Sequence, residues 1–345
     1  MTKLYVALDK GLAVIEQRNG AWTASLHLAE SSPQSIAVDP QRPQRLYCAT
    51  FRKGLWRSDD GGNSWERLEN GITQQQMIAV AVSSVERIDG YGVVYAGSEP
   101  SALFRSEDGG ESWQELPALL RLPSASTWSF PPRPYTSHVR WITPDPLVAG
   151  RVFVAIEAGA LVRSLDGGRT WEDRRPDGPY DTHTLVMHRQ APNRLYSAAG
   201  DGFMHAGNGF VVSDNGGDTW YRPDEGLHHH YLWSVAADPA DPATLVISAA
   251  ASPGTAHNPA QAESALYRRS GSSPWQLVSA GLPPARGTQT SVLAVHEAEP
   301  GVFYAANNNG IFRSADTGQT WESIPIRWPQ TEHLGRAHSL VVMPE

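Results

Sequence analysis

The stretch Ser58-Asp59-Asp60-Gly61-Gly62-Asn63-Ser64-Trp65 decides the fold, because it recurs along the chain. Four further copies share the pattern S-x-D-x-G-x-[ST]-W, with asparagine in place of aspartate once: SEDGGESW at 106–113, SLDGGRTW at 164–171, SDNGGDTW at 213–220 and SADTGQTW at 314–321. Two weaker copies end in Trp22 and Trp275. A segment that recurs at this kind of interval is typical of solenoids, propellers and arrays. The chain therefore contains seven similar units.

The spacing of the seven tryptophans predicts that these units close into a ring. Successive tryptophans lie 43 to 58 residues apart, and the step from Trp321 through both termini to Trp22 is 46 residues. Each unit contains four short apolar segments between turn residues, which in the second unit are 35–38, 46–50, 54–58 and 65–68. The C-terminus supplies one such segment, 338–343, and the N-terminus supplies three, around 4–8, 11–17 and 21–25. Together they complete one unit, which leaves no long exposed strand edge.

The sequence thus predicts an all-β, seven-bladed β-propeller with Asp-box turns, closed by one C-terminal and three N-terminal strands. We expect a single domain over residues 1–345, with blades at approximately 337–345 joined to 1–28, 33–70, 76–117, 137–175, 182–223, 231–279 and 290–326. Within each repeat, Ser and Asp side chains can bind the N–H groups of their own turn, and glycine permits a positive φ. A structural role is therefore expected for the third repeat residue, namely Asp60, Asp108, Asp166, Asn215 and Asp316. Calcium binding is not expected, because these residues lack companion carboxylates at the spacing of a calcium loop.

Composition and charge argue against several function classes. The net charge is −8, the isoelectric point is about 5.8 and the chain has no Lys/Arg run, so a nucleic-acid partner is not expected. No segment approaches 18 consecutive apolar residues, and residues 1–8 lack the apolar core of a secretory signal. The single cysteine, Cys48, excludes an internal disulfide. These features predict a cytoplasmic protein that does not bind membranes.

The repeats resemble those of the BNR/Asp-box propellers, which include sialidases, xyloglucan-active glycosidases with paired propellers, sortilin-type receptors and the photosystem II assembly factor. The chain is most similar to the bacterial WD40/YVTN/BNR-like repeat proteins, and the resemblance covers essentially its whole length. It implies the propeller fold and leaves the function open. It does not imply a true sialidase, because that family has six blades and an arginine triad, and this chain has no F-R-I-P-like motif near its start.

The first strand of each propeller blade lines the central channel, and function usually gathers in the loops opposite the Asp-boxes. Aligning the seven inner strands places one residue of each at the channel mouth: Gln34, Gln76, Arg140, His183, Trp233, Ser291 and His338. His138 lies two residues before Arg140 and therefore points to the same side. The ends of the second strands add Glu99, Glu157, Asp201 and the asparagines at 307–309, and the insert at 252–264 adds His257 and Glu263.

Three kinds of function fit this mouth. A divalent transition metal would be bound by imidazoles together with a carboxylate; the candidates are His138, His183 and His338, with His230 as a fourth histidine and Glu157 or Asp201 as the carboxylate. A glycosidase-like site needs two carboxylates beside a sugar, which Glu157 supplies with either Asp201 or Glu263. The catalytic candidates are therefore Glu157, Asp201 and His183, and the candidates for ligand binding are Arg140, Trp233, Trp128, Tyr231 and Asn308. A third possibility is a binding or assembly module without chemistry.

We expect the protein to bind a small polar ligand in this His- and aromatic-lined mouth, with a carbohydrate as the candidate class. Hydrolase or lyase activity and a histidine-bound metal are further hypotheses. The alternative is a non-catalytic scaffold that binds a protein partner. Arg286 and Arg336 could also reach the mouth, but the sequence alone does not assign them a role.

Overall fold

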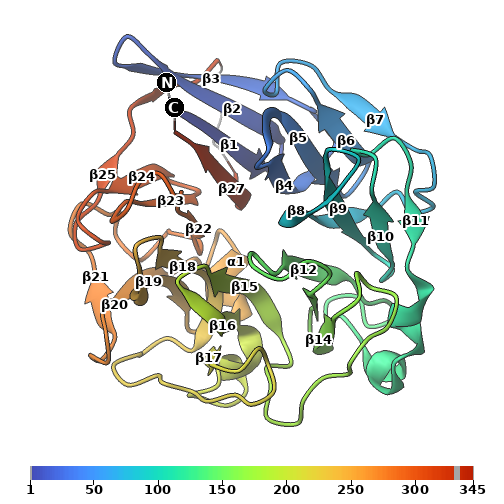
Figure 1. Ribbon diagram of the computed structural model, residues 1–345. Coiled ribbons are helices and arrows are strands. Elements are labelled where there is room, and N and C mark those ends of the chain that lie inside the picture. Colours follow the sequence, from blue (N-terminus) through green and yellow to red (C-terminus); the bar gives the residue numbers. More distant parts are fainter. Residues whose placement is uncertain (1, 330–334, 345) are drawn as a thin grey trace.

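The computed structural model describes residues 2–329 and 335–344 of the chain. Residues 1 and 345, which the sequence assigns to the first blade, lie outside the described residues. Seven small sheets of almost entirely antiparallel strands are arranged in a ring (Figure 1). The chain is therefore a seven-bladed β-propeller, as its repeats predict.

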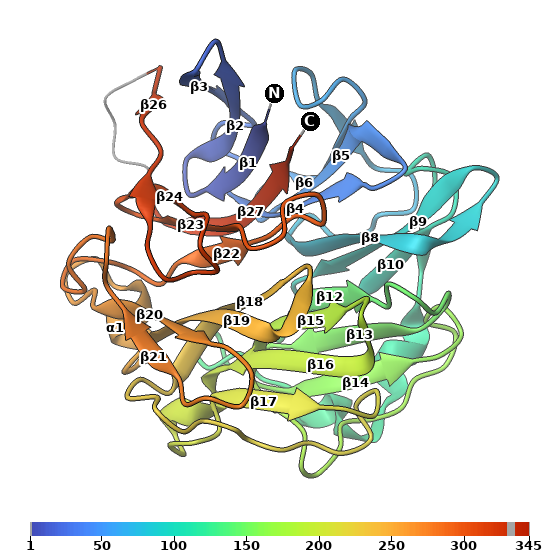
Figure 2. The same ribbon diagram turned by 60° about the vertical axis from the view of Figure 1, so that its left-hand side comes forward.

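Blade 1 closes the ring with strands from both ends of the chain. It contains the innermost strand β27 (Ala337–Met343), followed outward by β1 (Lys3–Leu8), β2 (Gly11–Arg18) and β3 (Ala21–His27). The pairing of β27 with β1 is antiparallel and runs from Lys3 opposite Met343 to Leu8 opposite Ala337. A two-residue strand, β26 (Ile326–Arg327), pairs with the outer edge of β3 in parallel. Figures 1 and 2 show the two termini side by side in this blade, which confirms the predicted closure.

Four blades contain four antiparallel strands each. Blade 2 consists of β4 (Pro33–Asp39), β5 (Arg42–Thr50), β6 (Gly54–Ser58) and β7 (Glu66–Leu68), and blade 3 of β8 (Met77–Ile88), β9 (Tyr91–Ser98), β10 (Leu103–Ser106) and β11 (Gln114–Glu115). Blade 6 consists of β18 (Tyr231–Asp238), β19 (Asp241–Ala250), β20 (Ser264–Arg269) and β21 (Gln276–Val278), and blade 7 of β22 (Val292–Ala294), β23 (Phe303–Asn307), β24 (Gly310–Ser314) and β25 (Glu322–Ser323).

Blades 4 and 5 have only three strands, whereas the sequence pattern predicts four. They consist of β12 (Val139–Pro144), β13 (Val152–Ile156) and β14 (Ala160–Ser164), and of β15 (Thr182–His188), β16 (Ala191–Ala199) and β17 (Phe210–Ser213). Each outer strand is reduced to one isolated bridge. A sequence difference accompanies this. The third residue after the repeat tryptophan is a buried apolar residue in blades 2, 3, 6 and 7 (Leu68, Leu116, Val278 and Ile324), but Arg174 and Pro223 in blades 4 and 5. Blade 1 keeps its outer strand with Ser25 at this position, so the correlation does not extend to it.

Helices are confined to short turns in the loops. They are α1 (Pro253–His257) and the 3₁₀ turns η1 (Pro117–Arg121), η2 (Pro123–Thr127) and η3 (Gly200–Phe203). Ser252 caps α1 by accepting the N–H of Thr255. Within the described part of the chain, no helix has the length and apolar character needed to cross a membrane.

The hydrophobic core lies between neighbouring blades. At one such interface, Tyr47 and Leu68 of blade 2 pack with Val94 and Phe104 of blade 3. Trp113, which ends the repeat of blade 3, belongs to the same buried cluster. The repeat tryptophan therefore adds apolar contacts across the joint between two blades.

The Asp-box turn of blade 2 is held by hydrogen bonds to its own residues. The carboxylate of Asp60 accepts the N–H of Ser64 at 2.9 Å and its hydroxyl at 2.6 Å. Gly62, at a φ of +91°, donates its N–H to the hydroxyl of Ser58. Trp65 donates its ring N–H back to the carbonyl of Gly62. The equivalent contacts recur at Asp108, Asp166 and Asp316.

Replacing Asp60 with alanine is expected to lower the free energy of unfolding by about 1–2 kcal/mol, because the turn loses its side-chain acceptor. Asp60→Asn is expected to be nearly neutral, because Asn215 accepts the N–H of Thr219 and donates to its hydroxyl in the equivalent turn of blade 5. Urea denaturation of both variants checks this. Equal losses in the two variants would mean that the negative charge, and not the hydrogen bonding, stabilises the turn.

Candidate functional site

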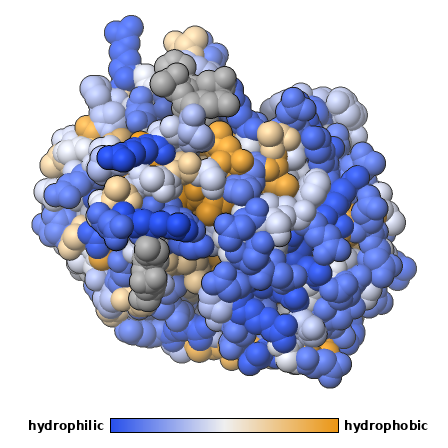
Figure 3. All heavy atoms as spheres, turned by 90° about the horizontal axis from the view of Figure 1, so that it is seen from above, coloured by the Kyte–Doolittle hydropathy of each residue, from blue (hydrophilic) through white to orange (hydrophobic). Residues whose placement is uncertain are grey.

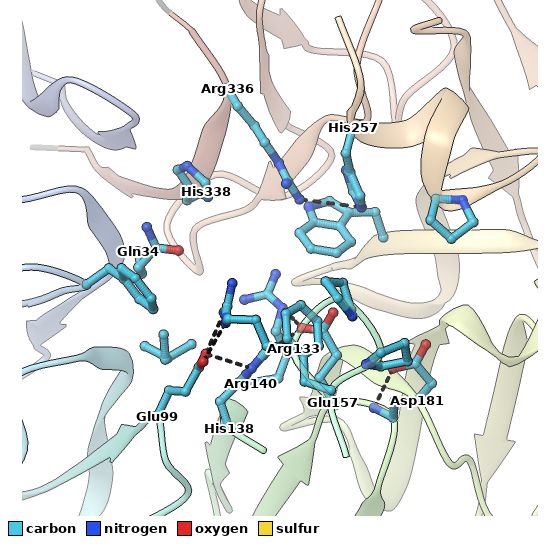
Figure 4. A pocket seen from close by; sticks show the side chains of 18 of the residues that line it. Gln34, Glu99, Arg133, His138, Arg140, Glu157, Asp181, His257, Arg336 and His338 are labelled. Carbon is cyan, nitrogen blue, oxygen red and sulfur yellow. Dashed lines mark hydrogen bonds and ion pairs between the residues drawn. The ribbon is translucent and has the colours of Figure 1, made fainter. Parts of the chain in front are cut away.

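A cavity of about 720 Å³ lies at the end of the channel opposite the Asp-box turns. Strand β5 fixes this direction: Gln44, near its start, accepts the N–H of Gly61 in the Asp-box, whereas Phe51, directly after its end, lines the cavity. Blades 1 to 6 all contribute to the lining, and their residues include Gln34, Phe51, Ile78, Glu99, Phe130, Arg133, His138, Arg140, Glu157, Asp181, Tyr231, Trp233, His257, Arg336 and His338. Figure 4 shows that the labelled side chains enter the cavity from several sides.

His138, directly before β12, lies between two carboxylates. Its Nε2 is 2.8 Å from Oε2 of Glu157, and its Nδ1 is 3.3 Å from Oε2 of Glu99. Burial works to lower the pKa of His138, but the charge of Glu157 and the contacts with both glutamates outweigh it and raise the pKa above its ordinary value. This direction favours the imidazolium form, which contacts one carboxylate of blade 3 and one of blade 4.

The same wall contains a bidentate ion pair between Glu99 and Arg133. The guanidinium Nε and Nη2 of Arg133 donate to the two carboxylate oxygens at 2.6 and 2.7 Å. Burial favours the neutral form of Glu99, but hydrogen bonds from His138 and Arg133 prevail and lower its pKa to about 2. The guanidinium also lies 4.8 Å from the ring centroid of Phe130. This pair holds the 130–133 loop against the end of β9 and balances its own charge.

On the facing side, two arginines stack on one indole ring. The guanidinium carbons of Arg140 and Arg336 each lie 4.5 Å from the ring centroid of Trp233. Burial lowers the pKa of Arg140, and burial together with the charge of Arg140 lowers the pKa of Arg336 to about 10. The Nε atoms of both arginines are buried without a hydrogen-bond partner among the described residues. Positive charge is therefore less well compensated on this wall than on the opposite one.

Tyr231 connects two histidines at the base of the cavity. Its hydroxyl lies 3.0 Å from Nε2 of His257 and 3.5 Å from Nε2 of His183. Burial raises the pKa of Tyr231 well above its ordinary value, so the phenol stays neutral and can donate. Burial and the charge of Arg336 hold the pKa of His257 well below its ordinary value, so that ring is neutral and can accept. These groups provide uncharged hydrogen-bonding contacts beside the arginines.

Three residues between blades 4 and 5 could hold a metal ion. Among the described residues, ligand atoms of Glu157, Asp181 and His183 lie within 4.8 Å of one another. The Nε2 of His183 is 3.6 Å from Asp181 and 3.9 Å from Glu157. Because Nδ1 of His183 lies 2.6 Å from the carbonyl oxygen of Leu232, Nδ1 must donate, and Nε2 is left to face the two carboxylates. One imidazole and two carboxylates suit a divalent transition metal.

The three histidines predicted to bind a metal have separate partners in the structure. His138 is bound by the two glutamates, and His183 lies against Leu232. The Nε2 of His338 is 2.7 Å from Oδ1 of Asp9, and burial lowers the pKa of that imidazole although Asp9 opposes the shift. A metal site in this cavity therefore fits the carboxylate-containing set better than the three histidines.

Most of the other predicted residues do converge. The cavity lining includes His138, Arg140, Glu157, Tyr231, Trp233 and His338, with His183 fully buried behind Asp181. Three of the catalytic and ligand-binding candidates lie elsewhere. Asp201 accepts the N–H groups of Tyr180 and Asp181, so it fixes the turn before β15. The ring N–H of Trp128 donates to Ser124 within the core, and Asn308 binds the backbone of Gln289 and Gly287.

Two charged residues of the cavity were missed by sequence reasoning. Asp181 stands two residues before His183, just as His138 stands two residues before Arg140. The two-residue alternation of a strand, which placed His138 at the mouth, would therefore have placed Asp181 there as well. Arg133 gave no such signal, because it reaches the cavity from a loop whose path depends on its contact with Glu99. Glu99, His257 and Arg336 were recognised as neighbours of the mouth, and all three line the cavity.

No family model and no curated protein sequence matches this chain. Solved structures match its fold. The GH74 enzyme of Niastella koreensis has a TM-score of 0.70 at 18% identity over 93% of this chain and 52% of its own. The GH74 xyloglucanase of Xanthomonas campestris has a TM-score of 0.67 at 17% identity over 96% and 52%. YCF48 bound to a D1 peptide has a TM-score of 0.56 at 20% identity over 84% and 81%. The chain spans about half the length of both GH74 structures, and identities this low establish a shared propeller fold alone.

Proposed function

We propose that this propeller binds a small polar ligand in the cavity, and that a carbohydrate is the ligand class. The observation that carries the proposal is the composition of the walls. Aromatic rings from Phe51, Phe130, Tyr231 and Trp233 line a space that also contains closely placed charged and hydrogen-bonding groups. A volume of about 720 Å³ is in the range of small-molecule sites, which combine apolar walls with a few orienting polar groups.

Sugars have the matching chemistry, because their hydroxyls need directed hydrogen bonds and the C–H faces of their rings pack on aromatic side chains. The likeness of the fold to a xyloglucanase supports this ligand class.

For hydrolysis, Asp181 replaces Asp201 as the partner of Glu157. Burial and the charge of Glu157 raise the pKa of Asp181, whereas His138, His183 and Arg140 overcome the effect of burial and lower the pKa of Glu157. Carboxyl groups whose pKa values are pushed apart can serve as general acid and ionised partner.

Blocking the cavity is expected to abolish ligand binding. Gln34 lines the cavity and Gln41 is exposed at the opposite end of β4, so Gln34→Trp and Gln41→Trp add the same bulk in different places. In a melting-shift screen against neutral and acidic oligosaccharides, a ligand at 100 times its dissociation constant should stabilise the native protein by about 2.7 kcal/mol. Gln34→Trp should remove the shift and Gln41→Trp should retain it. A ligand whose shift survives Gln34→Trp binds outside the cavity and contradicts the proposal.

The alternative, a scaffold for a protein partner, agrees with the likeness to peptide-bound YCF48. Such a surface would ordinarily show a broad exposed apolar patch. The face in Figure 3, which is the one seen from above in Figure 1, is mostly hydrophilic, with apolar residues gathered in a hollow. What favours a small ligand over a protein is the charged, concave cavity itself.

A further inference from the structure

We infer that the ligand of this cavity carries an acidic group, which binds beside Trp233 between Arg140 and Arg336, so that the ligand class is an acidic saccharide with a carboxylate. This inference rests on the proposed function and narrows it.

The first observation is that these two arginines lack the close ion pairs found at other buried arginines of the propeller. Arg105 lies 2.6 Å from a carboxylate oxygen of Glu86, and Arg57 lies 2.6 Å from one of Glu111. Arg140 approaches its nearest carboxylate, Glu157, only to 3.5 Å. No carboxylate oxygen of residues 2–329 or 335–344 forms an ion pair with the Arg336 side chain, whose one polar contact is 3.5 Å from Nη2 to His257. Among the described residues, Arg140 thus has one carboxylate within ion-pair distance and Arg336 has none.

The second observation is that Glu157 is already engaged. Its Oε2 lies 2.8 Å from Nε2 of His138. Asp181 faces His183 at 3.6 Å, and Glu99 pairs with Arg133, so none of these three carboxylates lies closely against Arg140 or Arg336. Guanidiniums buried without a close carboxylate are unfavourable, and an anionic ligand would relieve this.

The third observation is a set of buried donors without partners on this wall. Among the described residues these atoms are Nε of Arg140, Nε of Arg336, Nε1 of Trp233 and Nδ1 of His257. Nε2 of His257 faces the hydroxyl of Tyr231 and the guanidinium of Arg336, so it accepts and the proton is on Nδ1. All four groups are donors in these states.

The arrangement of the two guanidiniums suits the carboxylate of an acidic sugar. A guanidinium presents its N–H groups as a planar fork that matches a carboxylate. Figure 4 shows Arg336 entering from the side of His257 and Arg140 from the side of His138, so an acidic group between them can contact both. The indole of Trp233, in contact with both guanidiniums, holds the two cations on the same wall of the cavity.

The test compares galacturonic-acid oligomers with their methyl esters, which have the same ring skeleton without the charge, and includes sugar phosphates as the other common source of anionic charge. Binding is measured by isothermal titration calorimetry. We expect the free acids to bind at least tenfold more tightly than the esters. Arg336→Gln should weaken binding of the free acids at least tenfold more than binding of the esters, and Arg336→Lys should retain part of the preference.

Melting of the unliganded variants separates a binding role from a structural one. Arg336→Gln removes a charge without an ion-pair partner among the described residues, so its melting temperature should not fall. Arg105→Gln, the matched control, breaks the ion pair with Glu86 and should melt lower with its acid preference intact.

Equal binding of acids and esters, or an equal loss of both in Arg336→Gln, overturns the inference but not the proposed function. Binding of sugar phosphates alone overturns the assignment to a carboxylate. If no saccharide binds, both the inference and the proposed function fail.

Discussion

Deletion of residues 337–345 is expected to leave a chain that aggregates and no longer melts cooperatively as a monomer. The deletion removes the innermost strand of blade 1, in which Ala337, Leu340 and Val342 are buried. Burying one Leu or Val side chain contributes about 1.5–3 kcal/mol, and each lost hydrogen bond to β1 costs about 1 kcal/mol. The sum exceeds about 5 kcal/mol, which is comparable to the stability of an entire domain.

The deletion also exposes the edge of β1, whose residues from Leu4 to Leu8 are all buried in the intact ring. An apolar unpaired edge of this kind pairs readily with other chains. Soluble yield, light scattering and thermal circular dichroism measure the outcome. The control is a circular permutant that links the adjacent termini and opens the exposed hairpin at Asp89 and Gly90, so that every strand is retained. If the truncated chain melts as the permutant does, closure of the ring contributes little to stability.

Glu157→Gln is expected to lower the free energy of unfolding by about 3 kcal/mol, which is the usual effect of removing one partner from a buried ion pair. The substitution preserves shape but removes the charge that faces His138 and Arg140. Ligand binding should weaken as well, because the site loses the group that fixes the imidazolium. Chemical denaturation at neutral pH gives the stability, and the melting-shift screen reports on binding.

Two further variants make this result specific. Glu297→Gln removes an exposed carboxylate that pairs with Arg189, and it should change stability by less than about 0.5 kcal/mol. Adding His138→Gln to Glu157→Gln should recover part of the loss, because the neutral pair no longer leaves a buried imidazolium without its anion. A double variant that loses the sum of the two single effects would show that the two side chains do not act as a pair.

The ring could be predicted from the sequence because its determinants are local and repeated. The turn around Asp60 uses residues four positions apart, and the tryptophan that follows it packs at the joint between blades. The missing outer strands of blades 4 and 5 accompany a change at one position per blade, Arg174 and Pro223, within an otherwise regular pattern. A repeat pattern predicts the shared structure well but not such single departures from it.

The candidate site could be predicted only where a strand carries its residues. His138, Arg140 and Trp233 follow the alternation of inner strands, and all three line the cavity. Asp201 looked equivalent by position, but the start of η3 turns its carboxylate toward backbone N–H groups. Arg133 comes from an irregular loop that no periodicity describes. The charge balance of the cavity depends on such loop residues, so it emerged only from the folded arrangement.

The antiparallel pairing of β1 with β27 brings Lys3 opposite Met343, so both chain ends leave the ring at the same edge. A force that pulls the two ends apart therefore loads one residue pair at a time, beginning with Lys3 and Met343 and moving inward to Leu8 and Ala337. Strands loaded in this way peel like a zipper, whereas strands pulled along their length must break all of their hydrogen bonds together. The seam that holds the propeller firmly against heat is thus its weakest point under mechanical tension.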